Sequence, residues 1–135
     1  MKKINKFITE YIVKKKLDKA IDSEDHYIYF PETKDELIEN LNELISKDIY
    51  DFNCINTSAI TDMSSLFYDS KFEDINMDVS KWDVSNVTNM GGLFYKCANF
   101  NCDLSNWNVS KVTNMTYMFY DCENFKGKGL EKMGC

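Results

Sequence analysis

The stretch WDVSNVTNM at residues 82–90 returns as WNVSKVTNM at residues 107–115, a shift of 25 positions. The agreement continues beyond it, because LFY at 93–95 is matched by MFY at 118–120 and NF at 99–100 by NF at 124–125. A more divergent copy, INTSAITDM, begins at Ile55. Such a period marks a repeat architecture, in which each unit buries its apolar face against its neighbours. The chain is therefore predicted to be a repeat protein.

Two hydrophobic patterns alternate within each copy. A short pattern of the form LxxLxL comes first and is typical of a strand. A longer pattern with helical spacing follows it, as in Val87, Met90 and Cys97, and Ser85 stands where an N-cap would begin that helix. The strand-like positions are Phe52, Ile55 and Thr57, then Val79, Trp82 and Val84, then Leu104, Trp107 and Val109, and finally Leu130, Met133 and Cys135.

A strand followed by a helix about every 25 residues is the unit of a leucine-rich-repeat horseshoe. We therefore expect an α/β fold, a short leucine-rich-repeat-like solenoid with an N-terminal helical cap. Stacking of the units would place Trp82 beside Trp107 and Phe94 beside Phe119.

The chain is predicted to divide into three parts. Residues 1–26 read as an N-terminal amphipathic helix, and residues 27–50 as a strand-helix cap over the first repeat. Thr33 with Glu36 three residues later is a capping-box signature for the helix of that cap. Residues 51–135 form the repeat solenoid, with about three repeats and a truncated final strand.

Charge and cysteine content exclude several classes of function. A formal net charge of −6 argues against direct binding of a nucleic-acid backbone and permits a protein partner with a basic surface. The five cysteines contain no CxxC pair and His26 is the only histidine, so we expect no zinc site, no disulfide framework and no cofactor. Because no apolar run approaches a membrane span and no cleavage site follows the first residues, we expect a cytoplasmic protein with no membrane contact.

Nothing in the sequence supplies the parts of an active site. The patterns GxSxG, HExxH, Walker A and GxGxxG do not occur, and His26 beside Asp25 is typical of an ordinary surface turn. The chain is therefore predicted not to be an enzyme.

The wording WDVSNVTNM…LFYKCANF and WNVSKVTNM…MFYDCENF resembles a bacterial surface-protein repeat family of about 26 residues per unit, the BspA-like repeats also known from mycoplasma lipoproteins of unknown function. The resemblance covers roughly residues 27–135 and implies a leucine-rich-repeat-like solenoid with adhesion or protein-binding roles. It implies no catalytic residues. The sequence departs from surface members in having no secretion signal or long array, which favours a short intracellular version, cellular or phage-borne.

Residues between the strand-like positions are expected to point outward from a concave strand face and to bind a protein partner. A second expected surface is an open C-terminal edge, covered by a partner or by a second copy in a homodimer. The leading hypothesis is therefore a non-enzymatic protein-binding module. The alternative is a small acidic phage-encoded inhibitor, of the anti-CRISPR kind, acting on a nucleic-acid-dependent defence complex. The candidate partner-binding residues are Asn56, Lys81, Asp83, Asn106 and Asn108.

Overall fold

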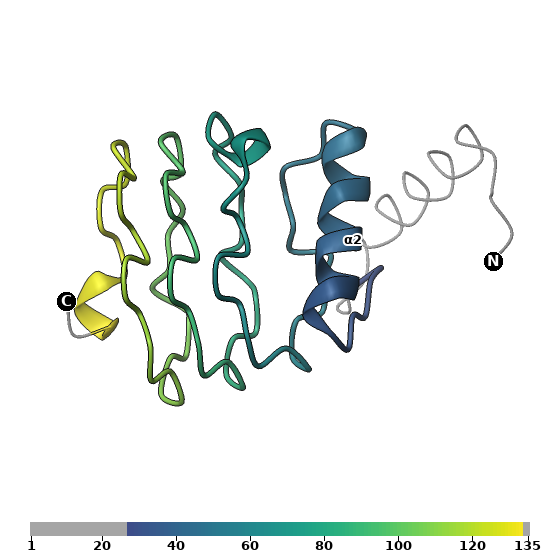
Figure 1. The fold of residues 1–135 in the computed structure, drawn as a ribbon. Coiled ribbons are helices and arrows are strands. Elements are labelled where there is room, and N and C mark those ends of the chain that lie inside the picture. The colour runs from purple at the N-terminus through teal and green to yellow at the C-terminus, as the bar shows by residue number, and fades with distance from the viewer. Residues whose placement is uncertain (1–26, 134–135) are drawn as a thin grey trace, which may run out of the picture.

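The computed structural model describes residues 27–133 as a row of elongated coils with one helix at its end (Figure 1). Helix α2, Lys34–Ser46, lies beside the first coil, and the chain then runs through successive coils toward the C-terminus. We name these coil 1 (residues 51–77), coil 2 (78–102) and coil 3 (103–127). Coils 1 and 2 begin at equivalent positions, since Asp51 forms a parallel bridge with Asp78. The 3₁₀ helix η1, Ser70–Phe72, lies in coil 1, and η2, Leu130–Met133, follows coil 3.

The expected fold class, an α/β solenoid with a strand and a helix in each repeat, is wrong. Between residues 27 and 133 the structure contains α2, the two short 3₁₀ helices and no β-strand. Neighbouring segments form only isolated parallel bridges, and the coils themselves are irregular backbone. The bridges join Tyr29 to Ile55, Asp51 to Asp78, Asp62 to Asn89, and Asn89 to Asn114.

Tight turns take the place of the expected helix in coil 2. The N–H of Val87 donates to the carbonyl of Val84 at 3.0 Å, and the N–H of Cys97 donates to that of Phe94, also at 3.0 Å. Apolar residues three positions apart can share one side of a series of such turns as well as one side of a helix, which explains why the pattern was misleading. A helix through the segment is also opposed by Gly92, whose φ is +63°.

Short polar side chains shape the turns. The Ser85 N–H, expected to lie at a helix N-cap, instead donates to Asp83 Oδ1 at 3.0 Å, which closes an Asx turn. The same bond from residue i+2 to an Asp or Asn side chain recurs through all three coils. The side chains that accept it are those of Asp51, Asn56, Asp62, Asp69, Asp78, Asp83, Asn89, Asp103, Asn108 and Asn114.

Backbone hydrogen bonds join the coils at equivalent positions. Met63 of coil 1 donates its N–H to the carbonyl of Asn89 in coil 2 at 2.9 Å, and Met90 of coil 2 donates to Asn114 of coil 3 at 2.8 Å. These bonds satisfy backbone groups that turns leave free. They also hold equivalent positions of the copies side by side.

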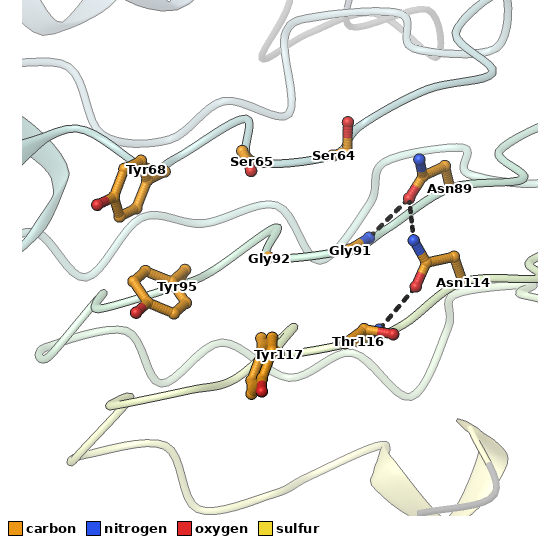
Figure 2. A pocket seen from close by; sticks show the side chains of 10 residues that line it. All are labelled: Ser64, Ser65, Tyr68, Asn89, Gly91, Gly92, Tyr95, Asn114, Thr116 and Tyr117. Atoms are coloured by element: carbon orange, nitrogen blue, oxygen red, sulfur yellow. Dashed lines mark hydrogen bonds between the residues drawn. The ribbon is translucent and has the colours of Figure 1, made fainter.

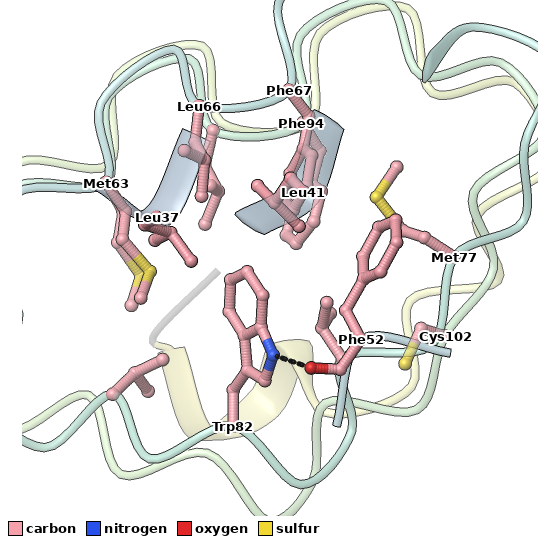
Figure 3. Packing of buried hydrophobic residues seen from close by; sticks show 14 of the residues in the cluster. Leu37, Leu41, Phe52, Met63, Leu66, Phe67, Met77, Trp82, Phe94 and Cys102 are labelled. Carbon is pink, nitrogen blue, oxygen red and sulfur yellow. Dashed lines mark hydrogen bonds between the residues drawn. The ribbon is translucent and has the colours of Figure 1, made fainter. Parts of the chain in front are cut away.

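Aromatic rings stack through the interior in the same register. The rings of Phe67 and Phe94 lie 5.6 Å apart and 8° from parallel, and those of Phe94 and Phe119 lie 5.7 Å apart. The expected pairing of Phe94 with Phe119 is therefore confirmed. Trp82 lies in the same core and donates its indole N–H to the carbonyl of Phe52 (Figure 3). Trp107 makes the equivalent bond, at 2.9 Å, to the carbonyl of Val79.

Helix α2 was predicted correctly from its capping box. Thr33 accepts the N–H of Glu36 at 3.2 Å, and the helix buries one leucine-rich side against coil 1. The strand of the predicted strand-helix cap at residues 27–50 is reduced to the single bridge of Tyr29. The amphipathic helix predicted for residues 1–26 lies outside the described residues. The buried side chains of α2 are Leu37, Leu41 and Leu44.

The truncated final strand is also wrong, because residues 130–133 form the 3₁₀ helix η2. Gly129 leads into it with φ +102°, and a Cβ at this position would lie 2.6 Å from the carbonyl carbon of Leu104. Only glycine allows this close approach of two backbone segments. No helix among the described residues is long and apolar enough to cross a membrane.

Candidate functional site

A hollow of about 380 Å³ crosses all three coils on one face of the stack (Figure 2). In the view of Figure 2, tyrosine side chains form one wall and asparagine side chains the other, with small residues between them. Asn89 and Asn114 are equivalent positions of coils 2 and 3, and Tyr68 and Tyr95 are equivalent positions of coils 1 and 2, whereas Tyr117 is the coil 3 equivalent of Gly92. The residues that line the hollow are Ser64, Ser65, Tyr68, Asn89, Gly91, Gly92, Tyr95, Asn114, Thr116 and Tyr117.

The bottom of the hollow is formed by Ser64, Ser65, Gly91 and Gly92, whose side chains are small or missing, so the hollow is open between its two walls. A Cβ at Gly91 would lie 2.9 Å from Asn114 Nδ2, so a larger residue would displace the asparagine wall. Gly92 has φ +63°, and its equivalents Ser65 and Tyr117 share that left-handed conformation, with φ of 52° and 57°. This conformation is strained for residues other than glycine and turns the chain sharply at the same place in each coil.

The asparagine wall is held rigidly by its own hydrogen bonds. Asn89 Oδ1 accepts the N–H of Gly91 at 2.9 Å and the Nδ2 group of Asn114 at 3.1 Å. Asn114 Oδ1 in turn accepts the N–H of Thr116 at 2.9 Å. These bonds occupy both lone pairs of Asn89 Oδ1 and one N–H of Asn114, so the Nδ2 group of Asn89 and the second N–H of Asn114 are the donors left for a ligand.

The tyrosine wall continues into a ladder of exposed and partly exposed tyrosines. Tyr68 and Tyr95 have ring centroids 5.0 Å apart, and Tyr95 and Tyr120 are stacked, also at 5.0 Å. Tyr117 meets Tyr120 edge-to-face at 5.7 Å and is 66% exposed. Tyrosine offers apolar area and a hydroxyl at low cost in side-chain entropy, which is why it is enriched at protein interfaces.

The described residues that line the hollow carry no charged side chain. The nearest charges lie at its margins, where Lys96 Nζ stands 5.6 Å from the ring of Tyr95 and Lys34 donates to the carbonyl of Ser64. Asp62 precedes the asparagine wall in coil 1. Burial acts to raise the pKa of Asp62, but hydrogen bonds from Ser64 and the charge of Lys34 outweigh it and lower the pKa. This lining is suited to noncovalent binding of an uncharged surface.

The described residues that line the hollow include no His, Cys, Asp or Glu side chain. The four described cysteines are free thiols, and burial raises the pKa of Cys97 to about 12 and that of Cys54 to about 11, so both stay protonated at neutral pH. Among residues 27–133, no group of three His, Cys, Asp or Glu side chains is placed to hold a metal ion.

The residues predicted to bind a partner lie on another part of the coils. Asn56, Asp83 and Asn108 occupy equivalent positions of the three coils, and each accepts an Asx-turn bond from the residue two positions on. Lys81 and Asn106 form a second row, and both are exposed. The structure thus aligns these residues in rows without a strand face. The side-chain oxygens of the first row are engaged in Asx turns, which shape the local backbone.

Sequence reasoning missed the tyrosine ladder that borders the hollow. Tyr68, Tyr95 and Tyr120 are the third letters of LFY, LFY and MFY in the repeat, so the recurrence was visible. The middle letter of each triplet is a phenylalanine that lies in the core or packs against it, and the third is a tyrosine that is exposed or partly exposed. Nothing in the sequence tells which of two adjacent aromatic residues is buried when the backbone is neither helix nor strand.

A stack of closely similar coils joined by backbone bonds defines the class of this chain as a repeat protein. The family described as "Mycoplasma protein of unknown function, DUF285" matches residues 35–132, and the chain belongs to this family. The resemblance noted from the sequence is thereby confirmed at the level of the family. Neither the comparison with curated proteins nor the comparison with solved structures found a match.

Proposed function

We propose that this chain is a non-enzymatic protein-binding module that docks a partner protein against the hollow and its tyrosine ladder. The observation that carries the proposal is the row formed by Tyr68, Tyr95 and Tyr120, which packs at 5.0 Å spacing and remains accessible at the surface. Ring-to-ring packing restrains the side chains before a partner arrives, so little entropy is lost on binding.

The neighbouring groups complement the tyrosines. Asn89 and Asn114 present amide N–H groups that are fixed by their own internal bonds, and Ser65 and Gly92 leave room for a partner side chain between the walls. A rigid aromatic surface beside oriented polar groups is the usual composition of a protein-binding hot spot. The adhesion or protein-binding roles implied by the BspA-like resemblance agree with this proposal.

The partner is expected to present an uncharged surface to the hollow, so binding should depend weakly on salt. The alternative function, an acidic inhibitor that occupies a basic channel of a nucleic-acid-dependent complex, draws on the net charge of −6 alone. Binding that weakens about tenfold or more between low and physiological salt would favour that inhibitor instead.

The test is capture of partners by the tagged full chain from the native host, with nuclease treatment, followed by direct binding measurements on the protein recovered. The variant Tyr68→Ser/Tyr95→Ser should weaken binding by about 2 kcal/mol or more, because it removes two adjacent aromatic anchors. Tyr50→Ser is the matched control, since Tyr50 is also partly exposed but lies outside the hollow. Unchanged binding by the double variant would refute docking at the hollow.

A further inference from the structure

Coil 3 presents a row of backbone N–H groups at the end of the stack. In coil 2 the equivalent groups, those of Met90, Gly92, Phe94 and Lys96, all donate to carbonyls of coil 3, at distances from 2.7 to 2.9 Å. We call the corresponding groups of coil 3 the terminal edge. They belong to Met115, Tyr117, Phe119 and Asp121, and none has a hydrogen-bond acceptor within residues 27–133.

Side chains along the same coil are incompletely covered. Met90 and Phe94 of coil 2 are fully buried beneath coil 3. Their equivalents Met115 and Phe119 are only partly buried, although Phe119 occupies the same position in the phenylalanine stack. An apolar strip therefore accompanies the row of donors.

The segment that follows coil 3 covers a different part of it. The backbone carbonyl of Lys128 accepts the N–H of Leu104 at 3.1 Å, and Gly129 lies against the backbone of Leu104. Residues 127–133 therefore turn back beside the start of coil 3. The terminal edge at residues 115–121 keeps its donors free in the described structure. A row of alternate, unpaired backbone groups is a template for another chain.

We propose that the terminal edge binds an extended polypeptide segment of a partner protein, which adds to the stack as a further coil would. Four carbonyls of the segment accept the N–H groups of Met115, Tyr117, Phe119 and Asp121, and one bulky apolar side chain covers Phe119. This inference rests on the proposed protein-binding function and names the part of the partner that is recognised. The two surfaces adjoin, because the Tyr117 side chain lines the hollow while its N–H lies on the terminal edge.

The contact between coils 2 and 3 shows which groups such a row of donors binds. Phe94 donates its N–H to the carbonyl of Met118 at 2.9 Å while its ring packs on Phe119 at 5.7 Å, so backbone carbonyls and an aromatic ring arrive together from one extended segment. Addition of an extended peptide to unpaired backbone groups is a general mode of recognition.

A second copy of the chain is a poorer occupant. Two-fold pairing of terminal edges would place the N–H groups of residues 115–121 against the same groups of the other copy, and two donors form no hydrogen bond. At the other end of the stack α2 lies beside coil 1, and Lys34 donates to the carbonyl of Ser64, which engages one of the acceptors that a second copy would need.

The probe is a synthetic peptide with the sequence of residues 110–121, SKVTNMTYMFYD, which already pairs with coil 2 in the required register. Amide hydrogen exchange of the full chain is followed by NMR with and without the peptide. We expect exchange at Met115, Tyr117, Phe119 and Asp121 to slow by about tenfold or more at saturation, because each N–H gains an acceptor. The amides of coil 2 should be protected in both states, which also verifies the fold.

Two controls make the result specific. A peptide with Ser in place of its Phe, and the protein variant Phe119→Ser with coil 2 protection intact, should each weaken binding at least about tenfold. Peptide binding without protection of the four amides, or no saturable binding, would overturn the terminal-edge proposal. Protection of these amides by a dimer of the free chain would overturn it in favour of a second copy.

The two proposals can fail separately. If Tyr68→Ser/Tyr95→Ser abolishes binding of the recovered partner but the peptide leaves the four amides unprotected, the hollow remains the docking surface and the terminal-edge inference is wrong. If the peptide protects the amides while the tyrosine variant binds the recovered partner normally, the hollow is not the docking surface and the inference stands.

Discussion

The indole Nε1 of Trp82 donates to the carbonyl oxygen of Phe52 at 2.8 Å, joining two residues 30 positions apart in adjacent coils. The same carbonyl also accepts the N–H of Ile55 at 3.1 Å, so Trp82 closes the turn of coil 1 from outside it. Trp107 repeats this relationship with Val79 of coil 2. Coils 1 and 2 are thus each fixed by the tryptophan of the next coil.

Replacement of Trp82 by Phe should destabilise the protein by about 2–3 kcal/mol. The variant loses a buried hydrogen bond and leaves a small cavity, while Phe52 keeps its bond from Ile55. Urea denaturation followed by circular dichroism measures the effect. Tyr50→Phe, which removes an exposed hydroxyl bonded to Asp48, is the control and should change stability by less than about 0.5 kcal/mol. Equal effects of the two variants would show that the indole bond contributes little.

Truncation of the phenylalanine stack should cost more in its middle than at its end. Phe94 is buried between Phe67 and Phe119, whereas Phe119 is partly exposed. Phe94→Ala is expected to cost about 4 kcal/mol and Phe119→Ala about 2 kcal/mol, because the apolar area returned to water is smaller at the end. The difference in unfolding free energy is obtained from the midpoints of urea denaturation, provided that the variants unfold with the same dependence on urea concentration. A reversed order would mean that the end of the stack is covered.

Stability should be nearly constant from neutral pH to about pH 5 and fall below about pH 4. Hydrogen bonds from Ser80 and Asn53 lower the pKa of Asp78 despite its burial, and hydrogen bonds from Ser105 lower that of Asp103. Because the folded-state pKa lies below the unfolded value, the unfolded chain takes up protons first as pH falls. The stabilisation is therefore complete above the unfolded pKa and is lost through the folded pKa. Urea midpoints measured across this range test the expectation.

A matched variant isolates the carboxylates responsible. Asp62→Asn/Asp78→Asn/Asp103→Asn keeps an oxygen acceptor at each Asx turn but removes the titrating group, as Asn already does at Asn89 and Asn108. We expect the variant to lose stability less steeply below pH 4 than the native chain. If the variant loses stability below pH 4 as steeply as the native chain, other carboxylates are responsible for the loss.

The sequence alone determined that the chain repeats, the length of the repeat and most of its buried positions. Trp82, Trp107 and Phe94 recur at fixed intervals, and their burial follows from apolar character without reference to backbone conformation. Helix α2 was also predictable, since Thr33 and the leucine spacing act within one segment. These features depend on local chemistry or on periodicity, both of which a sequence contains.

Tertiary structure decided the backbone of the coils and everything that depends on pairing between them. The spacing of Val87 and Met90 suits a helix or a series of turns, and the bond from Met90 to Asn114 of the next coil is available only when the turns form. The hollow brings Tyr68 to Tyr95 across 27 positions, and the free donors of coil 3 are recognised only by comparison with coil 2. Such features arise from contacts between distant segments, and hydrophobic pattern does not specify which backbone groups those contacts satisfy.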